Sequence, residues 1–458
     1  VTHALQLAPT DFSIGDTHVR TWAFNGSIPG PEFRVKQGRP VRFVVKNDLP
    51  EESSVHWHGI RLANAMDGVP GITQDPIAPS GEFVYEFVPP DAGTYFFHPH
   101  VGLQLDTGLY GSLIVEATHE RQAYDQDVVI VLDDWLDGVK GRSPMKEYMR
   151  LRKIGMPMGM RPRTPKRPYV GLDGRTPAAG SLGWIANALE SGSTDPGDVS
   201  YPYYLMNGRP PEDPWSLRVH PKQRIRLRVI NAAADTIFSF RVGEHPLTVI
   251  ACDGQDVHPI ETDAVVLGMG ERIDLLLDAS QSGAHEITAD ALGKSNKAVG
   301  VLRYTTATAA RATPGSATNL RVAGYSDLRS VDAPPLGKPS RSLTLGIGMD
   351  MMRGYVWTLG GQAYPKADTI DLARNETVDI VFANRSMMHM AHPMHLHGNL
   401  FAIAGADGGI VLKDTVLVGP TVSMPVRLHA ANPGRWLLHC HNDYHMMSGM
   451  MRELQIRA

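Results

Sequence analysis

One strand-like segment occurs three times in this chain, and this repeat limits the folds that the sequence can adopt. Residues 41–47 read VRFVVKN, residues 225–231 read IRLRVIN and residues 378–384 read VDIVFAN. Short apolar runs of this kind are typical of β-strands. A strand that recurs at such long intervals predicts three related domains in tandem.

A second repeat links the first and last thirds of the chain. Residues 93–100 (GTYFFHPH) and 434–441 (GRWLLHCH) match from the Gly to the closing His-x-His. The middle third has the corresponding segment 283–290 (GAHEITAD), where Thr288 and Asp290 replace the two histidines. We therefore expect the middle unit to keep the fold and to lack these ligands.

The remaining sequence predicts an all-β protein. Its 45 Gly and 34 Pro interrupt many short apolar runs, as in chains of short strands joined by turns. We predict three Greek-key β-sandwich domains at residues 1–118, 119–308 and 309–458. A short helix is expected at 146–154, followed by a long loop to residue 168 inserted in the middle domain.

Charge and composition exclude several classes of protein. The formal net charge is −4, which provides no positive field for a nucleic-acid backbone. No segment approaches the roughly 20 consecutive apolar residues of a membrane-spanning helix. The two cysteines allow at most one disulfide, and Cys252 is expected to be a small buried apolar residue. The chain begins at Val1, which is compatible with a removed export signal.

The histidines are the strongest functional signal. Among 19 His, eight form four His-x-His pairs, at 56/58, 98/100, 395/397 and 439/441. Residues i and i+2 of a strand point to the same side, so each pair offers two imidazoles to one point. A single pair would more often be ordinary core or surface histidines. Four pairs in corresponding strands of two related units indicate a metal cluster.

Cys440 predicts a second metal site on the same strand. It lies between His439 and His441, so its side chain points to the opposite face. His392, Cys440 and His445 offer two imidazoles and a thiolate, and Met450 can reach an axial position. This is the ligand set of a blue-copper site, and its soft sulfur ligands favour copper over magnesium, calcium or zinc.

Together these motifs resemble those of the multicopper oxidases, the family of laccases and cuprous oxidases. The matching segments are 56–59 (HWHG), 98–100 (HPH), 392–398 (HPMHLHG) and 439–450 (HCHNDYHMMSGM). The resemblance spans nearly the whole chain and implies three cupredoxin domains with four copper ions. It places a type 1 copper at His392, Cys440, His445 and Met450, a type 2 copper at His56 and His395, and two type 3 coppers at His58, His98, His100, His397, His439 and His441.

The resemblance also implies the reaction. The protein is expected to oxidise a phenolic or aromatic reductant, or Cu(I), one electron at a time, and to reduce O2 to water at a trinuclear cluster. Electrons are expected to enter through His445, whose ring edge should lie near the surface, and to pass through Cys440. An axial Met450 predicts a modest potential.

Two carboxylates are candidates for supplying protons to O2. The resemblance points to Asp67, nine residues after His58, although a turn residue before Gly68 is an equal alternative. Asp443 is the second candidate, and an exposed loop carboxylate explains it equally well. Related metallo-oxidases often place an acid directly after the last His, where this chain has Met446.

Methionines gather in three segments, and their thioethers suit Cu(I). Core packing is the commoner role of Met, and it is the better interpretation for Met394. Met388 and Met390 precede His392, where the resemblance to cuprous oxidases suggests docking of a substrate copper. The remaining members of the three segments are Met145, Met149, Met156, Met158, Met160, Met349, Met351, Met352 and Met387.

Two other functions compete with an oxidase. A non-catalytic copper-binding or sequestering protein of the cupredoxin class would not need complete ligand sets, and O2 uptake separates it from an enzyme. A copper nitrite reductase would not need four His-x-His pairs. Because three domains in one chain can close the metal interface, we expect a monomer. Aerobic copper chemistry favours a periplasmic, secreted or cell-surface location.

Overall fold

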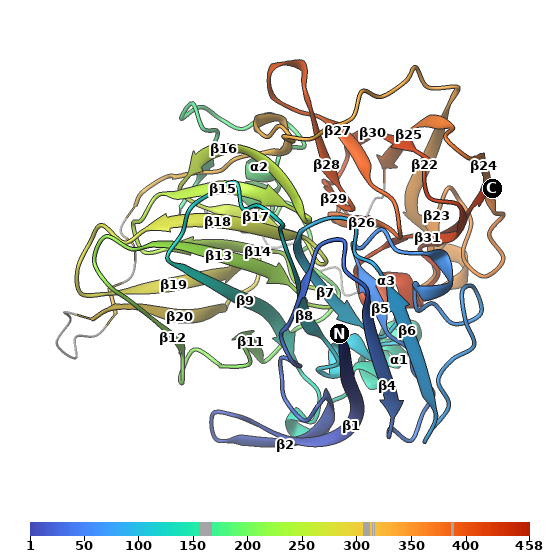
Figure 1. Cartoon of the computed structure of the whole chain (residues 1–458), viewed down its shortest axis with the longest axis horizontal. Coiled ribbons are helices and arrows are strands. Elements are labelled where there is room, and N and C mark those ends of the chain that lie inside the picture. Colours follow the sequence, from blue (N-terminus) through green and yellow to red (C-terminus); the bar gives the residue numbers. More distant parts are fainter. Residues whose placement is uncertain (155–166, 306–311, 314, 316, 386–388) are drawn as a thin grey trace.

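Three pairs of β-sheets follow one another along the chain in the computed structural model (Figure 1). The structure describes residues 1–154, 167–305, 312, 313, 315, 317–385 and 389–458. In Figure 1 the first unit is blue, the middle unit runs from teal through green to yellow, and the last unit is orange to red. The first and last units lie side by side, and the middle unit packs against both.

The first unit consists of two four-stranded sheets. One sheet has the order β2-β1-β4-β6, with β1 (Thr2–Ile14), β2 (Thr17–Phe24), β4 (Val41–Asn47) and β6 (Glu82–Phe87). The other has the order β3-β8-β7-β5, with β3 (Phe33–Lys36), β5 (His56–His58), β7 (Gly93–His98) and β8 (Gly111–Glu116).

The middle unit pairs a six-stranded sheet with a five-stranded one. The larger sheet has the order β11-β9-β13-β18-β15-β16, with β9 (Gln126–Trp135), β11 (Tyr203–Met206), β13 (Arg224–Asn231), β15 (Leu247–Cys252), β16 (Gln255–Thr262) and β18 (Arg272–Asp278). The smaller has the order β12-β20-β19-β14-β17, with β12 (Trp215–Val219), β14 (Phe238–Val242), β17 (Val265–Leu267), β19 (Ala284–Ala291) and β20 (Lys297–Tyr304).

The last unit repeats this arrangement. Its larger sheet has the order β23-β22-β25-β30-β27-β28, with β22 (Arg341–Met349), β23 (Trp357–Leu359), β25 (Thr377–Asn384), β27 (Phe401–Ala404), β28 (Ile410–Lys413) and β30 (Ser423–His429). The smaller has the order β24-β32-β31-β26-β29, with β24 (Ile370–Ala373), β26 (His392–Leu396), β29 (Thr415–Val418), β31 (Gly434–Cys440) and β32 (Met451–Arg457).

The repeated strand occupies the same place in all three units. β4, β13 and β25 each pair in parallel with the opening strand of their unit, β1, β9 and β22. Each also pairs antiparallel with a later strand, β6, β18 or β30. In β4, Val41, Phe43 and Val45 are buried, as their alternation predicts. The structure therefore confirms that the three segments are equivalent.

The described part of the chain also contains three α-helices and one small sheet. α1 (Pro144–Ile154) confirms the helix expected at 146–154. The loop predicted after it falls on residues 155–166, outside the described residues. α2 (Leu182–Glu190) begins at Ser181, whose side chain accepts a hydrogen bond from the Trp184 amide, and α3 (Asp443–Met447) follows β31. β10 (Tyr169–Val170) and β21 (Leu320–Arg321) form a short parallel pair.

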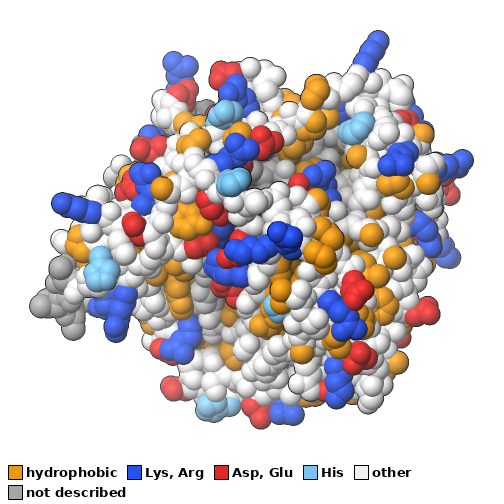
Figure 2. Space-filling model, in the orientation of Figure 1, with side chains coloured by type: hydrophobic (Ala, Val, Ile, Leu, Met, Phe, Trp, Pro, Cys, Tyr) orange, Lys and Arg blue, Asp and Glu red, His pale blue; other side chains and the backbone are white. Residues whose placement is uncertain are grey.

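Charges on the surface are mixed. On the face shown in Figure 2, Lys and Arg side chains are interspersed with Asp and Glu, as a net charge of −4 leads one to expect. No helix within the described ranges has the length and apolar character that crossing a bilayer requires.

Candidate metal centre

The four His-x-His motifs lie at the facing sheets of the first and last units. β5 pairs antiparallel with β7, which places His56 opposite His98. β26 pairs in the same way with β31, which places His395 opposite His439. The same two strand positions in the middle unit are β14 and β19, where Ser239 lies opposite Asp290. Each end unit thus presents two adjacent His-x-His motifs at one place.

Rings from the two end units interleave. The His56 ring stacks on His397 with centroids 3.9 Å apart, and the His58 ring stacks on His395 at 3.8 Å. All eight rings are buried except His100, which is partly buried. Residues far apart in the chain therefore form one histidine cluster between the two units.

The free ring nitrogens point toward one another. His56 and His98 donate from Nδ1 to the carbonyl oxygens of Asp67 and Pro99, at 2.8 and 2.9 Å. His439 donates in the same way to the Cys440 carbonyl oxygen at 2.9 Å. These bonds leave Nε2 as the lone-pair nitrogen. The buried Nε2 atoms of His56 and His98 have no hydrogen-bond partner.

Ring nitrogens across the cluster form two groups of three. Nδ1 of His58 and Nε2 of His441 lie 3.2 Å apart, and His98 completes this group. Nε2 of His397 and Nε2 of His439 lie 3.0 Å apart, and His100 completes the other. His56 and His395 meet His58 in a further group.

The cluster is suited to cations. Burial, followed by the neighbouring histidines, lowers the pKa of six rings well below the ordinary value, so they are neutral. The nitrogens of neutral imidazoles that face one another carry lone pairs and no hydrogen, so they cannot hydrogen-bond to each other. A metal ion between them accepts these lone pairs. The six rings are those of His58, His98, His100, His397, His439 and His441.

Asp67 lies directly against this cluster. Its carboxylate accepts a hydrogen bond from Nδ1 of His397 at 2.8 Å and lies 3.3 Å from Nδ1 of His56. It is fully buried and also ends a short 3-10 helix, Asn64–Met66. Asp67 therefore occupies a turn and also lies beside the histidine cluster, so the two alternatives for its position hold together.

On the other face of β31, a second cluster surrounds Cys440. Its Sγ lies 3.8 Å from Nδ1 of His392 and 3.6 Å from Nδ1 of His445. Met450 is buried, and its amide and carbonyl bond to the backbone of His445 and Cys440. Burial raises the pKa of the Cys440 thiol, so the thiolate requires a nearby cation. Two imidazoles and a thiolate, bonded through the backbone to a buried methionine, are residue types that suit a copper ion.

The expected surface position of His445 is wrong, because the ring is fully buried. Nε2 of His445 donates to the Asp198 carboxylate at 3.0 Å, and Tyr355 donates a second hydrogen bond to the same oxygen. The Trp357 ring covers the imidazole at a centroid distance of 4.0 Å. Asp198 lies between β10 and β11, and no pattern in the sequence connects it to His445.

Asp443 is not an exposed loop residue. It begins α3, is buried, and one of its carboxylate oxygens lacks a hydrogen-bond partner. Burial, and then the charge of Asp134, raise the pKa of Asp443 well above its ordinary value. Asp106 has a raised pKa through burial, then through Asp134 and Asp133. Several acidic groups thus share one buried junction between the three units.

Asp414 and Arg272 are further residues of the site that the motifs did not indicate. Nε2 of His58 donates to the Asp414 carboxylate at 3.2 Å. Arg272 donates to both oxygens of that carboxylate, at 2.7 Å each. Although burial opposes it, Arg272 holds the pKa of Asp414 below its ordinary value. These contacts depend on domain packing, which no local spacing encodes.

The methionines divide into buried and exposed residues. Met390, proposed for metal docking, is only 2% exposed and packs in the core, which argues against that role. Met388 lies outside the described residues, as do Met156, Met158, Met160 and Met387. Met394 is fully buried, as predicted.

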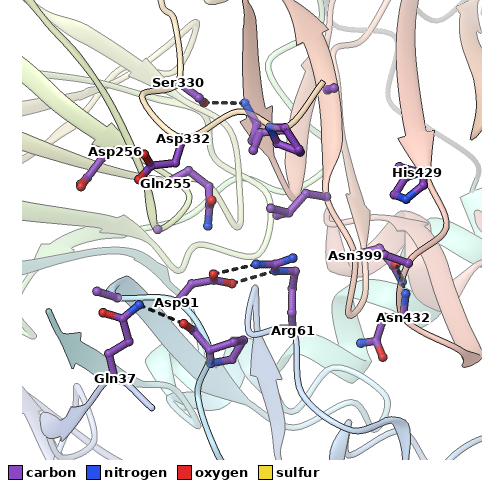
Figure 3. Close-up of a pocket in the computed structure, with 18 of the residues that line it drawn as sticks. Gln37, Arg61, Asp91, Gln255, Asp256, Ser330, Asp332, Asn399, His429 and Asn432 are labelled. Carbon is purple, nitrogen blue, oxygen red and sulfur yellow. Dashed lines mark hydrogen bonds and ion pairs between the residues drawn. The ribbon is translucent and has the colours of Figure 1, made fainter. Parts of the chain in front are cut away.

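A cavity of about 680 Å³ lies outside both clusters. Figure 3 shows the Arg61–Asp91 ion pair on one side of it and His429, Asn399 and Asn432 on another. All three units contribute to its lining. Arg61 and Asn399 follow His58 and His397 in the chain by three and two residues, so the segments that follow two cluster histidines line the cavity.

Comparisons with known proteins identify the family. Models of the multicopper oxidase family match residues 7–120, 184–310 and 338–458. Multicopper oxidase MmcO of Mycobacterium tuberculosis is 38% identical over 462 residues, covering 99% of this chain and 86% of that protein. A copper resistance protein A homolog of Pseudomonas syringae is 29% identical over 560 residues, covering 97% of this chain and 92% of its own length.

Solved structures confirm the predicted fold. The laccase from Botrytis aclada superposes with a TM-score of 0.80 at 24% identity, covering 99% of this chain and 88% of the laccase. The all-β architecture of three cupredoxin-like units is therefore correct. The chain belongs to the multicopper oxidases. It is an oxidoreductase that uses copper and couples the oxidation of a reductant to the reduction of O2, which disfavours a purely sequestering role.

Proposed function

We propose that this protein holds four copper ions and reduces O2 to water with electrons taken singly from a small reductant. His392, Cys440, His445 and Met450 would hold a type 1 copper, and His56 and His395 a type 2 copper. The two groups of three histidines would each hold one type 3 copper. Bound copper supplies the one-electron redox chemistry.

The observation that carries this proposal is the position of β31 between the two clusters. Cys440 faces its own pair of histidines, while His439 and His441 face the rings of the first unit. One peptide bond joins Cys440 to each of the two histidines. The chain therefore provides a short covalent path between a mononuclear site and the histidine cluster.

Protons for O2 reduction have two proposed sources among the buried acids. Asp67 touches His397 directly, and Asp443 follows His441 by two residues at the acidic junction. Asp67 is therefore close to the histidine cluster in space, and Asp443 is close to it along the chain.

The proposed electron entry lies over His445. Because this ring is buried, the Asp198 carboxylate and the Tyr355 ring separate it from solvent. A cavity of about 640 Å³ has Asp198 in its lining, and a second cavity, of about 180 Å³, has Tyr355 in its lining. A small reductant docked in the first cavity would be separated from His445 by Asp198, and one docked in the second by Tyr355 and Asp198.

Exposed methionines favour Cu(I) as one reductant. Met145, Met149, Met352 and Met447 are exposed although large and apolar. Their segments converge, because Tyr148 of α1 donates to the Met447 carbonyl oxygen at 3.3 Å and packs against Tyr355 at 6.3 Å. Thioether sulfur binds Cu(I) well. Phenolic compounds, which need no thioethers, are the other proposed substrates.

Paired O2-uptake assays test these proposals. With a phenol or with Cu(I), uptake of one O2 for four reductant molecules supports four-electron reduction. A variant with Met145, Met149, Met352 and Met447 all replaced by Leu is expected to lose Cu(I) oxidation and keep phenol oxidation. Equal retention of both rates would reject the Cu(I) surface, and absence of O2 uptake with every reductant would reject the oxidase.

We further propose domain boundaries near residues 118 and 308, a monomeric state and a location outside the cytoplasm. Of the described sheets, only the β10–β21 pair joins strands from across the second boundary. The interface that carries the histidine cluster closes within one chain, which supports a monomer. Sedimentation of the purified protein and fractionation of the source cells test the last two proposals.

A further inference from the structure

No described residue of the middle unit belongs to the histidine cluster, but the middle unit touches the cluster. The turn between β17 and β18 lies against two ligand rings. A Cβ atom on Gly270 would lie 2.9 Å from Cδ2 of His441 and 3.0 Å from Cε1 of His58. Gly270 also has a φ of +83°, a conformation that favours Gly. The backbone of the middle unit therefore forms part of the wall of the cluster.

Arg272, two residues later, connects the middle unit to both end units. Its two terminal nitrogens each donate to one oxygen of Asp414 at 2.7 Å, and Nε donates to the Thr94 carbonyl oxygen at 3.1 Å. Arg272 and Asp414 are fully buried. A two-pronged Arg–carboxylate contact fixes both the position and the plane of the carboxylate.

Asp414 in turn holds two cluster rings by different atoms. Nε2 of His58 donates to its carboxylate at 3.2 Å, and Nδ1 of His395 donates to its carbonyl oxygen at 3.0 Å. The first bond explains why His58 turns Nδ1, not Nε2, toward His441. A carboxylate that receives the outer N–H of a histidine sets its tautomer and its ring orientation.

The residues beside Asp414 are also held by the middle unit. Lys413 forms ion pairs with Asp253 at 2.9 Å and with Glu271 at 3.1 Å. The Thr415 amide donates to Asp253 at 3.2 Å. The preceding residue, Leu412, bonds instead within the last unit: its amide donates to Ser330 at the wall of the cavity in Figure 3. Three consecutive residues of the last unit, 413 to 415, thus have side-chain partners in the middle unit.

We propose that Arg272 is a positioning residue through which the ligand-free middle unit sets the geometry of the copper cluster, by fixing Asp414 and thereby the His58 and His395 rings. This inference rests on the copper assignments proposed above. It gives the middle unit a role in assembling the cluster in addition to joining the two ligand-bearing units.

The first test replaces Arg272 by Lys, which keeps the charge and removes the two-pronged contact. Arg228→Lys is the matched control. Arg228 is equally buried and binds the Asp127 carboxylate with two nitrogens at 2.6 and 2.9 Å. Its remaining partners are Thr94 and Asp274, neither of which is a cluster histidine. Apo-protein is titrated with Cu(I) against a chromogenic chelator. The blue thiolate band and the type 2 electron paramagnetic resonance signal are recorded after oxidation.

Arg272→Lys is expected to bind copper at the histidine cluster about 10- to 100-fold more weakly, as loss of a ligand's outer partner usually does. Its blue band should be unchanged, since the Cys440 site has no contact with Arg272. Arg228→Lys should resemble the wild type in both readouts. Full cluster affinity in Arg272→Lys, or an equal loss in Arg228→Lys, would overturn the proposal.

A second variant perturbs the same ion pair from the other side and serves if Arg272→Lys does not fold. A Cβ atom on Gly59 would lie 2.3 Å from Arg272 Nη2 and 2.5 Å from Asp414 Oδ2. Gly71 has a similar positive φ, +76° against +86°, but a Cβ there meets nothing within 4 Å. An Ala side chain is strained at a positive φ in both variants, but only in Gly59→Ala does it also displace the Arg272–Asp414 ion pair. Only Gly59→Ala should therefore lower the affinity of the histidine cluster for copper. Equal copper affinity in the two variants would overturn the proposal.

Copper binding by the wild type separates failure of the oxidase proposal from failure of the proposed role of Arg272. If wild-type protein binds no copper at the histidine cluster, the proposed function fails and the role of Arg272 fails with it. If wild type and all four variants fill the cluster alike, the oxidase stands and only the positioning role is refuted.

Discussion

Replacing Asp134 by Asn is expected to remove a specific part of the pH dependence of stability. Asp134 lies on β9 at the acidic junction and accepts hydrogen bonds from the amides of Ala234 and Asp235 at 2.9 and 3.1 Å. Burial raises the pKa of Asp134 from 3.8 to about 6, although Lys294 and Thr236 act in the opposite direction. The folded protein thus holds this proton to a higher pH than the unfolded chain does.

The size and sign of the effect follow from linkage. A shift of about 2 pKa units at about 1.4 kcal/mol each corresponds to about 3 kcal/mol. Below pH about 3 the carboxyl is protonated in both states and does not change the free energy of unfolding. As the pH rises toward about 6, the unfolded chain ionises first, so the free energy of unfolding falls. Above pH about 6 to 7 the loss is complete and constant.

Urea unfolding of the copper-free protein between pH 4 and about 7.5 measures this effect. Copper-free protein is required because metal binding has its own pH dependence. The lost hydrogen bonds of Asp134→Asn lower stability by a nearly constant amount, whereas the titration disappears. The unfolded carboxyl is already more than half ionised at pH 4, so the stability of wild type relative to the variant should fall by about 2.5 kcal/mol across this range. Parallel curves for the two proteins would refute the reasoning.

Two further substitutions test the copper sites. Asp67→Asn keeps an acceptor beside His397 but removes an ionisable group, so O2 reduction should slow about 10-fold or more with copper content retained; an unchanged single-turnover rate would contradict this. Asp198→Asn should slow reduction of the blue copper by added reductant about 10- to 100-fold, because His445 loses a charged hydrogen-bond partner. Stopped-flow bleaching of the blue band measures this rate. An unchanged rate in Asp198→Asn would contradict the proposed entry route.

The strand pattern allowed the two metal clusters to be predicted before the fold was known. His-x-His on a strand projects two rings to one side, and an intervening Cys projects to the other, whatever the surrounding structure. The structure places His439, Cys440 and His441 accordingly. The three related units could likewise be predicted from local sequence, because the repeated strand has a similar pattern of residues in each unit.

The environment of the clusters was not predictable in the same way. The burial of His445 depends on Asp198 and Trp357, which come from distant segments. The contact between Arg272 and Asp414 exists only once two units have packed together. Such pairs have no spacing that a single sequence displays, because domain packing brings together residues that are distant in the chain.

A copper count on wild type and Cys440→Ser, with the visible spectrum of each, tests the central claim most directly. We predict four copper ions and an intense blue band for the wild type. In Cys440→Ser the blue band and the oxidase activity should vanish while copper remains at the histidine cluster. A blue band that survives the loss of this thiol, or a wild type that binds copper at only one of the two clusters, would contradict the account.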